Sequence, residues 1–199
     1  MTKKIRQIPS RNYNNYKLYR EELRREFNYS CVYCELTENE TGGADTFQID
    51  HYVPKAKYPE LEAVYQNLFY SCSTCNSIKA DYWPSKAQRE NAEFYLNSFR
   101  HDVDLHISKE SYSWKPLSDC GTWNIQRLGL NLESITRIRS RRATNELGKK
   151  THAALLSIKN LGAKVPSELM DEIDACLVES SQIDWLEGQR MDSRRPRRR

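Results

Sequence analysis

The sequence predicts an α+β fold: a small core of two short strands and one helix, stapled by a four-cysteine zinc site, with mainly helical extensions on both sides. Three observations support this. Two Cys-X-X-Cys pairs stand 37 residues apart. Between and after them follow an alternating polar and apolar segment, a short apolar run and the start of a helix. Outside the pairs, apolar residues recur at helical spacing.

The composition fits one ordinary domain with an extension, or two small domains, because the chain has 199 residues. Hydrophobic residues make up only 38% of it, but 12 Tyr and four Trp bury large areas and argue against disorder along the whole chain. The sequence lacks a run of about 18 apolar residues, which excludes a membrane span. Residues 1–10 lack the apolar stretch of a signal peptide, so we expect a cytoplasmic protein.

The net charge of +4 hides alternating blocks of opposite sign. Counting Lys and Arg against Asp and Glu, the blocks are +5 for 1–30, −4 for 31–80, −2 for 81–120, +7 for 121–165, −7 for 166–189 and +5 for 190–199. Such blocks indicate polyanion contacts or partner docking, and solvated helix faces are the alternative.

Four of the six cysteines form the two identically spaced pairs, Cys31 with Cys34 and Cys72 with Cys75. In a reducing compartment such pairs are more typical of metal ligands than of disulfides. Two of them complete a tetrahedron of thiolates, which suits structural Zn²⁺. Iron accepts the same ligands, and two unrelated thiol pairs are the other alternative. We interpret the remaining cysteines as small buried residues. They are Cys120 and Cys176.

The segment between the pairs places polar groups at the ends of short elements. Residues 46–49 alternate as a half-buried strand does, and this strand ends on Asp50 and His51 before Pro54 stops further pairing. A second apolar run covers 68–70, and a helix is expected around 76–79.

The stretches CVYC, IDHYVPK and YQNLFYSCSTCNSIKAD resemble the HNH nuclease family over about residues 14–83. The resemblance implies a ββα-metal core that hydrolyses DNA phosphodiesters and leaves 3′-hydroxyl and 5′-phosphate ends. It places the letters of the family motif on His51, Asn67 and Asn76, the last standing where many members have His.

The chemistry of these residue types agrees with the resemblance. His51 has the pKa range of a general base, and Asp50 supplies the hard anionic ligand that Mg²⁺ or Mn²⁺ prefers. Asn76 adds a neutral oxygen ligand. Asn67 is expected to orient the His51 backbone or ring, with a plain turn residue as the alternative. Lys79 is expected to reach a substrate phosphate, and a solvated lysine is the alternative.

The flanks predict helices. Tyr16, Tyr19, Leu23 and Phe27 recur at helical spacing before the first pair and are expected in the core. After the second pair, a helix is expected to begin at the Ser85 cap and to run to residue 99.

Residues 100–106 carry two histidines and two aspartates, which invites a second metal site. We favour a strand instead, because Val103, Leu105 and Ile107 alternate with polar residues, which turns His106 away from these apolar neighbours.

A basic helix is expected from Leu132, followed by a separate helix between Gly148 and Gly162. The arginines of the basic helix that begins at Leu132 are predicted to face phosphates. The alternative is that their aliphatic stems cover apolar surface. They are Arg137, Arg139, Arg141 and Arg142. An acidic amphipathic helix follows Pro166, and the Arg-rich residues 190–199 are expected to be disordered, binding either nucleic acid or the acidic helix.

The predicted organisation has four segments. They are an arm and helix at 1–30, the nuclease core at 31–84, a mainly helical extension at 85–189 and the tail at 190–199. We expect a metal-dependent DNA endonuclease, and the resemblance suggests an effector of a bacterial anti-phage system that acts with an ATPase partner. The alternative is a zinc-stapled nucleic-acid-binding subunit with weak or no catalysis. The sequence leaves open nicking against double-strand cleavage, DNA against RNA, sequence preference and oligomeric state.

Overall fold

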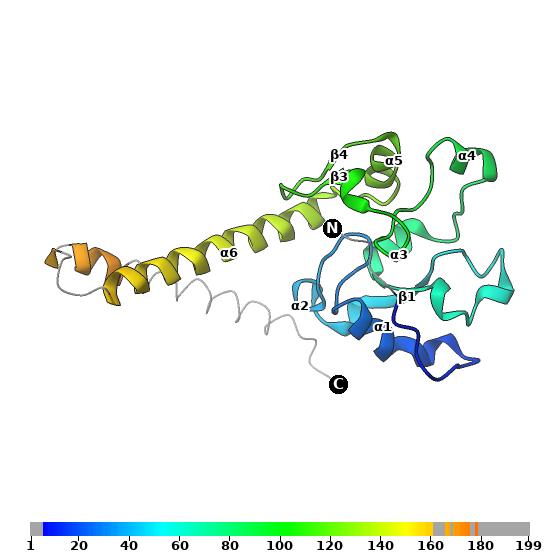
Figure 1. The fold of residues 1–199 in the computed structure, drawn as a ribbon, viewed down its shortest axis with the longest axis horizontal. Helices are drawn as coiled ribbons and strands as arrows, with labels where there is room; N and C mark the ends of the chain where they lie inside the picture. Colours follow the sequence, from blue (N-terminus) through cyan, green and yellow to red (C-terminus); the bar gives the residue numbers. More distant parts are fainter. Residues whose placement is uncertain (1–5, 161–165, 168, 176–177, 179–199) are drawn as a thin grey trace, which may run out of the picture. The chain divides into compact units, whose positions relative to one another are not determined.

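The computed structural model describes residues 6–160, 166–167, 169–175 and 178 (Figure 1). The chain divides into two compact units, one up to Arg139 and one from Ser140 onward. The predicted nuclease core and residues 85–139 lie in the same first unit, and the predicted boundary after residue 84 stays a prediction.

The centre of the first unit is the predicted arrangement of two strands and a helix (Figure 1). Strand β1, Phe47–His51, pairs antiparallel with β2, Leu68–Cys72, so that Asp50 lies opposite Phe69 and His51 opposite Leu68. Helix α3, Ser73–Lys79, follows β2 at once. The α+β fold class is therefore confirmed. β1 begins one residue later than the sequence predicts and continues through the two polar residues at its end.

The N-terminal helix packs its apolar side on this sheet. A 3-10 turn, Tyr16–Tyr19, leads into α1, Arg20–Glu26. Tyr19, Leu23 and Phe27 are buried, as the helical spacing predicts, and the Phe27 ring lies 5.7 Å from that of Phe69 on β2. Tyr16, which was also expected in the core, is only half-buried.

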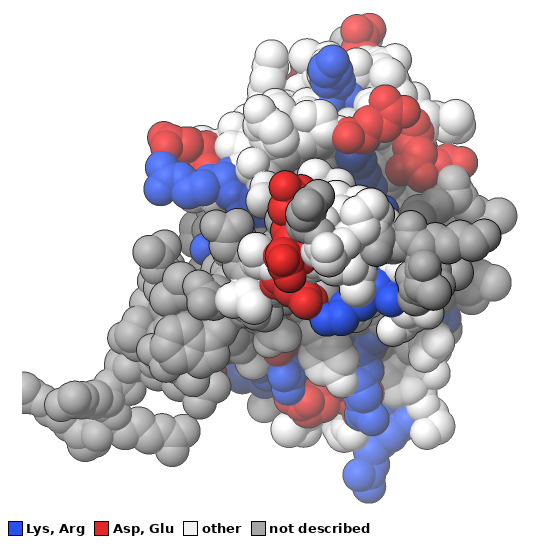
Figure 2. Space-filling view, turned by 90° about the vertical axis from the view of Figure 1, so that its left-hand side faces the viewer, with Lys and Arg blue, Asp and Glu red and all other residues white. Residues whose placement is uncertain are grey.

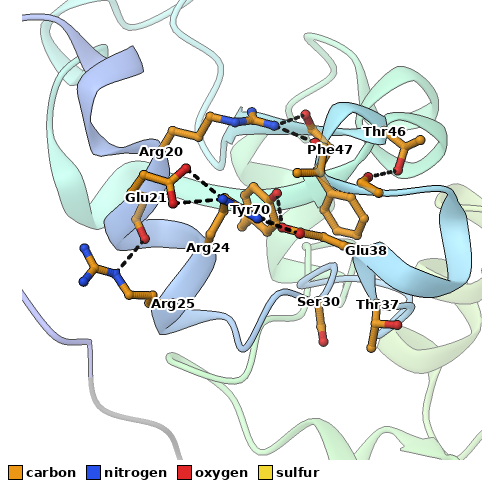
Figure 3. A network of polar contacts seen from close by, with 12 residues as sticks. Arg20, Glu21, Arg24, Arg25, Ser30, Thr37, Glu38, Thr46, Phe47 and Tyr70 are labelled. Atoms are coloured by element: carbon orange, nitrogen blue, oxygen red, sulfur yellow. Dashed lines mark hydrogen bonds and ion pairs between the residues drawn. The ribbon is translucent and has the colours of Figure 1, made fainter. Parts of the chain in front are cut away.

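A polar network joins α1, α2 (Glu38–Thr41) and β2 (Figure 3). The Arg24 guanidinium donates to both carboxylate oxygens of Glu38 at 2.8 Å, and the Tyr70 hydroxyl donates to Glu38 Oε1 at 2.5 Å. These bonds lower the pKa of Glu38, and the hydrogen bond from Arg24 makes the largest contribution. A buried carboxylate with this many donors stays charged, so the network fixes the chain on both sides of the first cysteine pair.

The segment after α3 differs from its prediction. Helix α4 begins at the Ser85 cap as expected but covers only Lys86–Glu90. Ala92 then takes a left-handed φ of 63°, and Tyr95, Leu96 and Phe99 are all buried. The left-handed turn at Ala92 ends the helical path, so these side chains reach the core from an irregular segment and not from a longer helix.

The expected strand over 103–107 is also largely wrong. Residues Val103–Leu105 form a 3-10 turn, and only Ile107–Ser108 pair, as β3, with β4 at Lys115–Pro116. Helix α5, Asp119–Arg127, packs closely on this hairpin. A Cβ at Gly121 would lie 1.9 Å from the His106 carbonyl oxygen, so this approach requires glycine.

Helix α6, Glu133–Asn160, is one continuous helix that passes through Gly148, where the sequence predicts a break. A single glycine in a helix costs only about 1 kcal/mol, which the remaining turns can absorb. In the second unit, Ser167 and Leu169–Ala175 are helical, in agreement with part of the predicted acidic helix. Cys176 and the tail at 190–199 lie outside the described residues.

Charged side chains of both signs are intermixed on the face that Figure 2 shows. Local ion pairs also join residues of opposite charge. On α6 they join Arg137 to Glu133 and Lys149 to Glu146, and in the second unit Lys159 binds Asp174. Such exposed pairs contribute little to stability, but they reduce the local charge of the basic block.

None of the helices that the structure describes combines the length and the apolar character needed to cross a membrane.

Candidate active site

The four paired cysteines come together beside the sheet. Their Sγ atoms all lie within 4.8 Å of one another, and those of Cys34 and Cys72 are 3.7 Å apart. Tetrahedral sulfurs around Zn²⁺, at about 2.3 Å from the ion, stand about 3.8 Å apart. All four side chains are buried. The cluster therefore has the donor set and the spacing that can hold zinc.

Backbone hydrogen bonds hold the first pair in place and tie it to β2. Cys31 N donates to Leu36 O at 2.9 Å, and Val32 N donates to Tyr70 O on β2 at 3.0 Å. The pKa values of the Cys34 and Cys75 thiols are raised, and the main cause for each is its hydrogen bond with Cys31. Four sulfurs this close cannot all be charged without a cation, so zinc binding would release protons.

A cavity of about 500 Å³ is lined by residues of β1 and α3 and by none of the four cysteines. It brings together three of the predicted site residues and three cations from other parts of the chain. They are Asp50, His51 and Asn76, with Lys17, Arg20 and Lys55.

His51 ends β1 at the wall of this cavity, and its side chain is held on two sides. Nε2 lies 3.0 Å from the Glu62 carbonyl oxygen, and the Tyr16 ring packs edge-on at 4.8 Å between ring centroids. Because a carbonyl only accepts, Nε2 carries the proton and Nδ1 is left as the acceptor. Burial lowers the pKa of His51, which keeps the ring neutral near pH 7. A neutral, oriented imidazole suits a general base.

Asp50 lies next to His51 but is 4% exposed, and each of its oxygens already accepts a hydrogen bond. The Tyr33 hydroxyl donates to Oδ2 at 2.5 Å, and Lys79 Nζ donates to Oδ1 at 2.9 Å. Each carboxylate oxygen has a second lone pair, so one remains on each for a cation.

The structure corrects the expectation that Lys79 contacts a phosphate or is solvated. Its side chain is fully buried, and Nζ also donates to the His51 carbonyl at 2.7 Å. A cation that is enclosed and paired in this way has no route to a phosphate in solvent.

The two asparagines have different surroundings. Asn67 is buried and holds the loop after His51, accepting from Val53 N at 2.8 Å and donating to Val53 O at 2.9 Å. It thus orients the loop two residues beyond His51 rather than the ring or backbone of His51 itself. Asn76 donates through Nδ2 to Gln48 Oε1 at 2.5 Å, which leaves its carbonyl oxygen as the group able to bind a cation.

The arginines of the basic block do not form one phosphate-binding row. Arg139 is 5% exposed, lies 3.5 Å from the Trp114 ring centroid and donates to Cys34 O at 3.0 Å. The expectation that it faces phosphates is therefore wrong, because its charge lies within the first unit. Arg137 and Arg141 are exposed and Arg142 is half-buried, and their contact with nucleic acid stays a prediction.

The sequence did not single out the cations that line the cavity. Lys17 and Arg20 lie one turn apart beside Tyr16, and Lys55 follows His51 by four residues. Lys17 is exposed, whereas Arg20 donates to the carbonyls of Ala44 and Phe47. The sequence signal that could have identified these cations is their closeness along the chain to Tyr16 and His51.

A divalent cation would have few ligands from the chain itself in this cavity. Among the residues that the structure describes, only the four cysteines form a group of three or more His, Cys, Asp or Glu ligand atoms able to share an ion. Asp50 and the Asn76 carbonyl are oxygen donors, the type that Mg²⁺ and Mn²⁺ prefer, and Mg²⁺ normally completes its shell with water and substrate phosphate. The donor set therefore fits such an ion, with water or substrate phosphate as its remaining ligands.

Comparison with known proteins points to the same segment. Residues 31–81 match the HNH endonuclease family. The Septu protein PtuB of Bacillus thuringiensis is 36% identical over 104 residues, which are 52% of this chain and 37% of that protein. No solved structure matches the chain significantly. The matched segment contains the four cysteines, both strands and α3, and residues 31–81 are thus an HNH endonuclease domain.

Proposed function

We propose that this chain is a divalent-metal-dependent endonuclease that hydrolyses DNA phosphodiester bonds. The observation that carries the proposal is the cavity that His51, Asp50 and Asn76 line together, with His51 Nδ1 left as an acceptor because Nε2 contacts the Glu62 carbonyl. Water activation by a base and charge neutralisation around phosphorus are the two requirements of phosphodiester hydrolysis, and this site offers groups for both.

In this proposal His51 takes a proton from the attacking water through Nδ1, while the Glu62 carbonyl keeps the ring in the required tautomer. A Mg²⁺ or Mn²⁺ held by Asp50 and Asn76 would stabilise the charge that develops on the phosphate and on the leaving oxygen. The products are the 3′-hydroxyl and 5′-phosphate ends that the family resemblance implies. Zinc on the four cysteines has a structural role.

The decisive experiment is cleavage of supercoiled, linear and single-stranded DNA by the purified chain. Mg²⁺ and Mn²⁺ are tested separately, with omission of both ions as the negative control. We expect cleavage only with added divalent ion, and the topology of the products separates nicking from double-strand cutting. Binding of DNA without cleavage under any of these conditions would favour the alternative, a zinc-stapled nucleic-acid-binding subunit.

We further propose that the substrate backbone enters along the cavity wall that carries Lys17 and Lys55. The Lys55 ammonium lies 4.5 Å above the Tyr16 ring and 2.6 Å from Glu62 Oε1. Because Tyr16 and Glu62 both contact the His51 ring, these contacts hold the Lys55 ammonium near His51. These two lysines replace Lys79 and Arg139 as candidates for phosphate contacts.

Replacing Lys17 or Lys55 by glutamine is expected to weaken DNA binding and to flatten its salt dependence. Each lost phosphate contact should reduce the slope of log Kobs against log salt by about 0.9 for duplex DNA. Binding is measured by fluorescence anisotropy without added Mg²⁺ or Mn²⁺, so that no cleavage occurs and the structural zinc is retained. Lys57→Gln is the matched control, because Lys57 is exposed on the same loop without lining the cavity. Equal slopes for all three variants would show that the DNA lies elsewhere.

The similarity to a Septu protein supports a role in bacterial anti-phage defence, the setting that the sequence resemblance also implies. Because the aligned region is only 37% of that relative, an ATPase partner stays a proposal. Co-purification with the products of neighbouring genes, with and without ATP, tests it.

A further inference from the structure

We propose that Tyr33 and Lys79 are positioning residues that hold the Asp50 carboxylate from two sides, so that the zinc site sets the geometry of the active site. This inference rests on the proposed function, because it assigns Asp50 to the catalytic cation.

The first cysteine pair supplies one side of this clamp. Tyr33 stands within the Cys31–Cys34 turn, and its side chain is 4% exposed. Its hydroxyl donates to Asp50 Oδ2 at 2.5 Å. The turn that would hold zinc therefore also fixes the position of this donor.

The second cysteine pair supplies the other side. Lys79 lies four residues after Cys75 on the same helix, α3, and its side chain has no exposed surface. Its ammonium donates to Asp50 Oδ1 at 2.9 Å and to the His51 carbonyl at 2.7 Å. Both halves of the cysteine cluster thus deliver one hydrogen-bond donor to the same carboxylate.

Two donors on different oxygens restrict Asp50 more than one does. An ion pair with Lys79 alone leaves the carboxylate free to turn, because an ammonium is a point charge without a preferred plane. The hydroxyl on the second oxygen removes that freedom. One lone pair per oxygen stays available to a cation, so the clamp orients the ligand without saturating it. Outer partners of this kind typically change metal affinity by about 10–100-fold when they are removed.

Tyr33→Phe tests the clamp, because it deletes one hydroxyl and leaves the ring in the core. We expect the dissociation constant for Mn²⁺, measured by the EPR signal of the free ion without DNA, to rise about tenfold. Zinc content should stay that of the wild type. The matched control is Tyr70→Phe, which removes another buried tyrosine hydroxyl that donates at 2.5 Å to a different carboxylate, that of Glu38 (Figure 3). Its Mn²⁺ affinity should match the wild type.

Three results would overturn the proposal. They are unchanged Mn²⁺ affinity in Tyr33→Phe, an equal loss in both variants, and loss of zinc from Tyr33→Phe, which would mean that the hydroxyl serves the fold instead. Absence of Mn²⁺ binding by the wild-type chain would count against it too. Cleavage assays separate this inference from the proposed function. Wild-type cleavage with equal Mn²⁺ affinities rejects the clamp alone, and a tenfold difference without any cleavage rejects the nuclease assignment alone.

Discussion

Replacement of Cys31 by serine is expected to unfold the HNH domain and to abolish its zinc content. The four thiols are buried and lie within 4.8 Å of one another, at the junction of the first turn, β2 and α3. Structural zinc contributes about 10 kcal/mol or more to folding, as much as the whole stability of an ordinary domain. Thermal melting by circular dichroism and metal analysis of the purified protein measure both effects.

Cys120→Ser is the matched control for this variant. Cys120 is also buried, at 2% exposed, but it lies outside the cysteine cluster and donates to the Phe94 carbonyl. A hydroxyl can replace that contact, so we expect Cys120→Ser to retain zinc and to melt close to the wild type. Full zinc content and unchanged melting in Cys31→Ser would contradict the four-thiolate site.

The sequence predicted the parts of the site that depend on local spacing. A Cys-X-X-Cys turn brings its two thiols together by itself, and the alternation over 46–49 predicts the strand that ends on Asp50 and His51. The turn and the strand require no knowledge of distant packing, and the structure reproduces them. Asn76, in the middle of α3, was assigned through the family resemblance instead.

The wrong predictions concern residues whose environment is set by contacts with distant parts of the chain. From the sequence, Lys79 and Arg139 were predicted to contact phosphate at the surface. In the structure Lys79 donates a hydrogen bond to Asp50, 29 residues away in sequence, and Arg139 donates one to the Cys34 carbonyl, 105 residues away. The helix after Ser85 stops at Glu90, and the buried side chains that follow enter the core from an irregular segment. Periodicity within one segment cannot show which distant groups will enclose a side chain, so buried ions are the least predictable part of this site.

Replacement of His51 by alanine is expected to reduce metal-dependent DNA cleavage by about 10²–10⁴-fold, the usual contribution of a general base. The ring occupies the cavity wall with Nε2 bound to the Glu62 carbonyl, and burial lowers its pKa. No other histidine lines this cavity among the described residues, so none can substitute for it. Initial rates of plasmid cleavage with saturating Mn²⁺ provide the measurement.

The same variant distinguishes a base from a residue that only supports the fold. His51 has no direct contact with the cysteine cluster in its hydrogen bonds, so His51→Ala should keep wild-type zinc content and melting. Added imidazole should restore part of the rate, because it can take the proton in the space that the side chain leaves. His152→Ala, on α6 and outside the cavity, should cleave at the wild-type rate. Wild-type cleavage by His51→Ala would mean that water is activated without this ring, by the cation or by substrate phosphate, and the base assignment would fail.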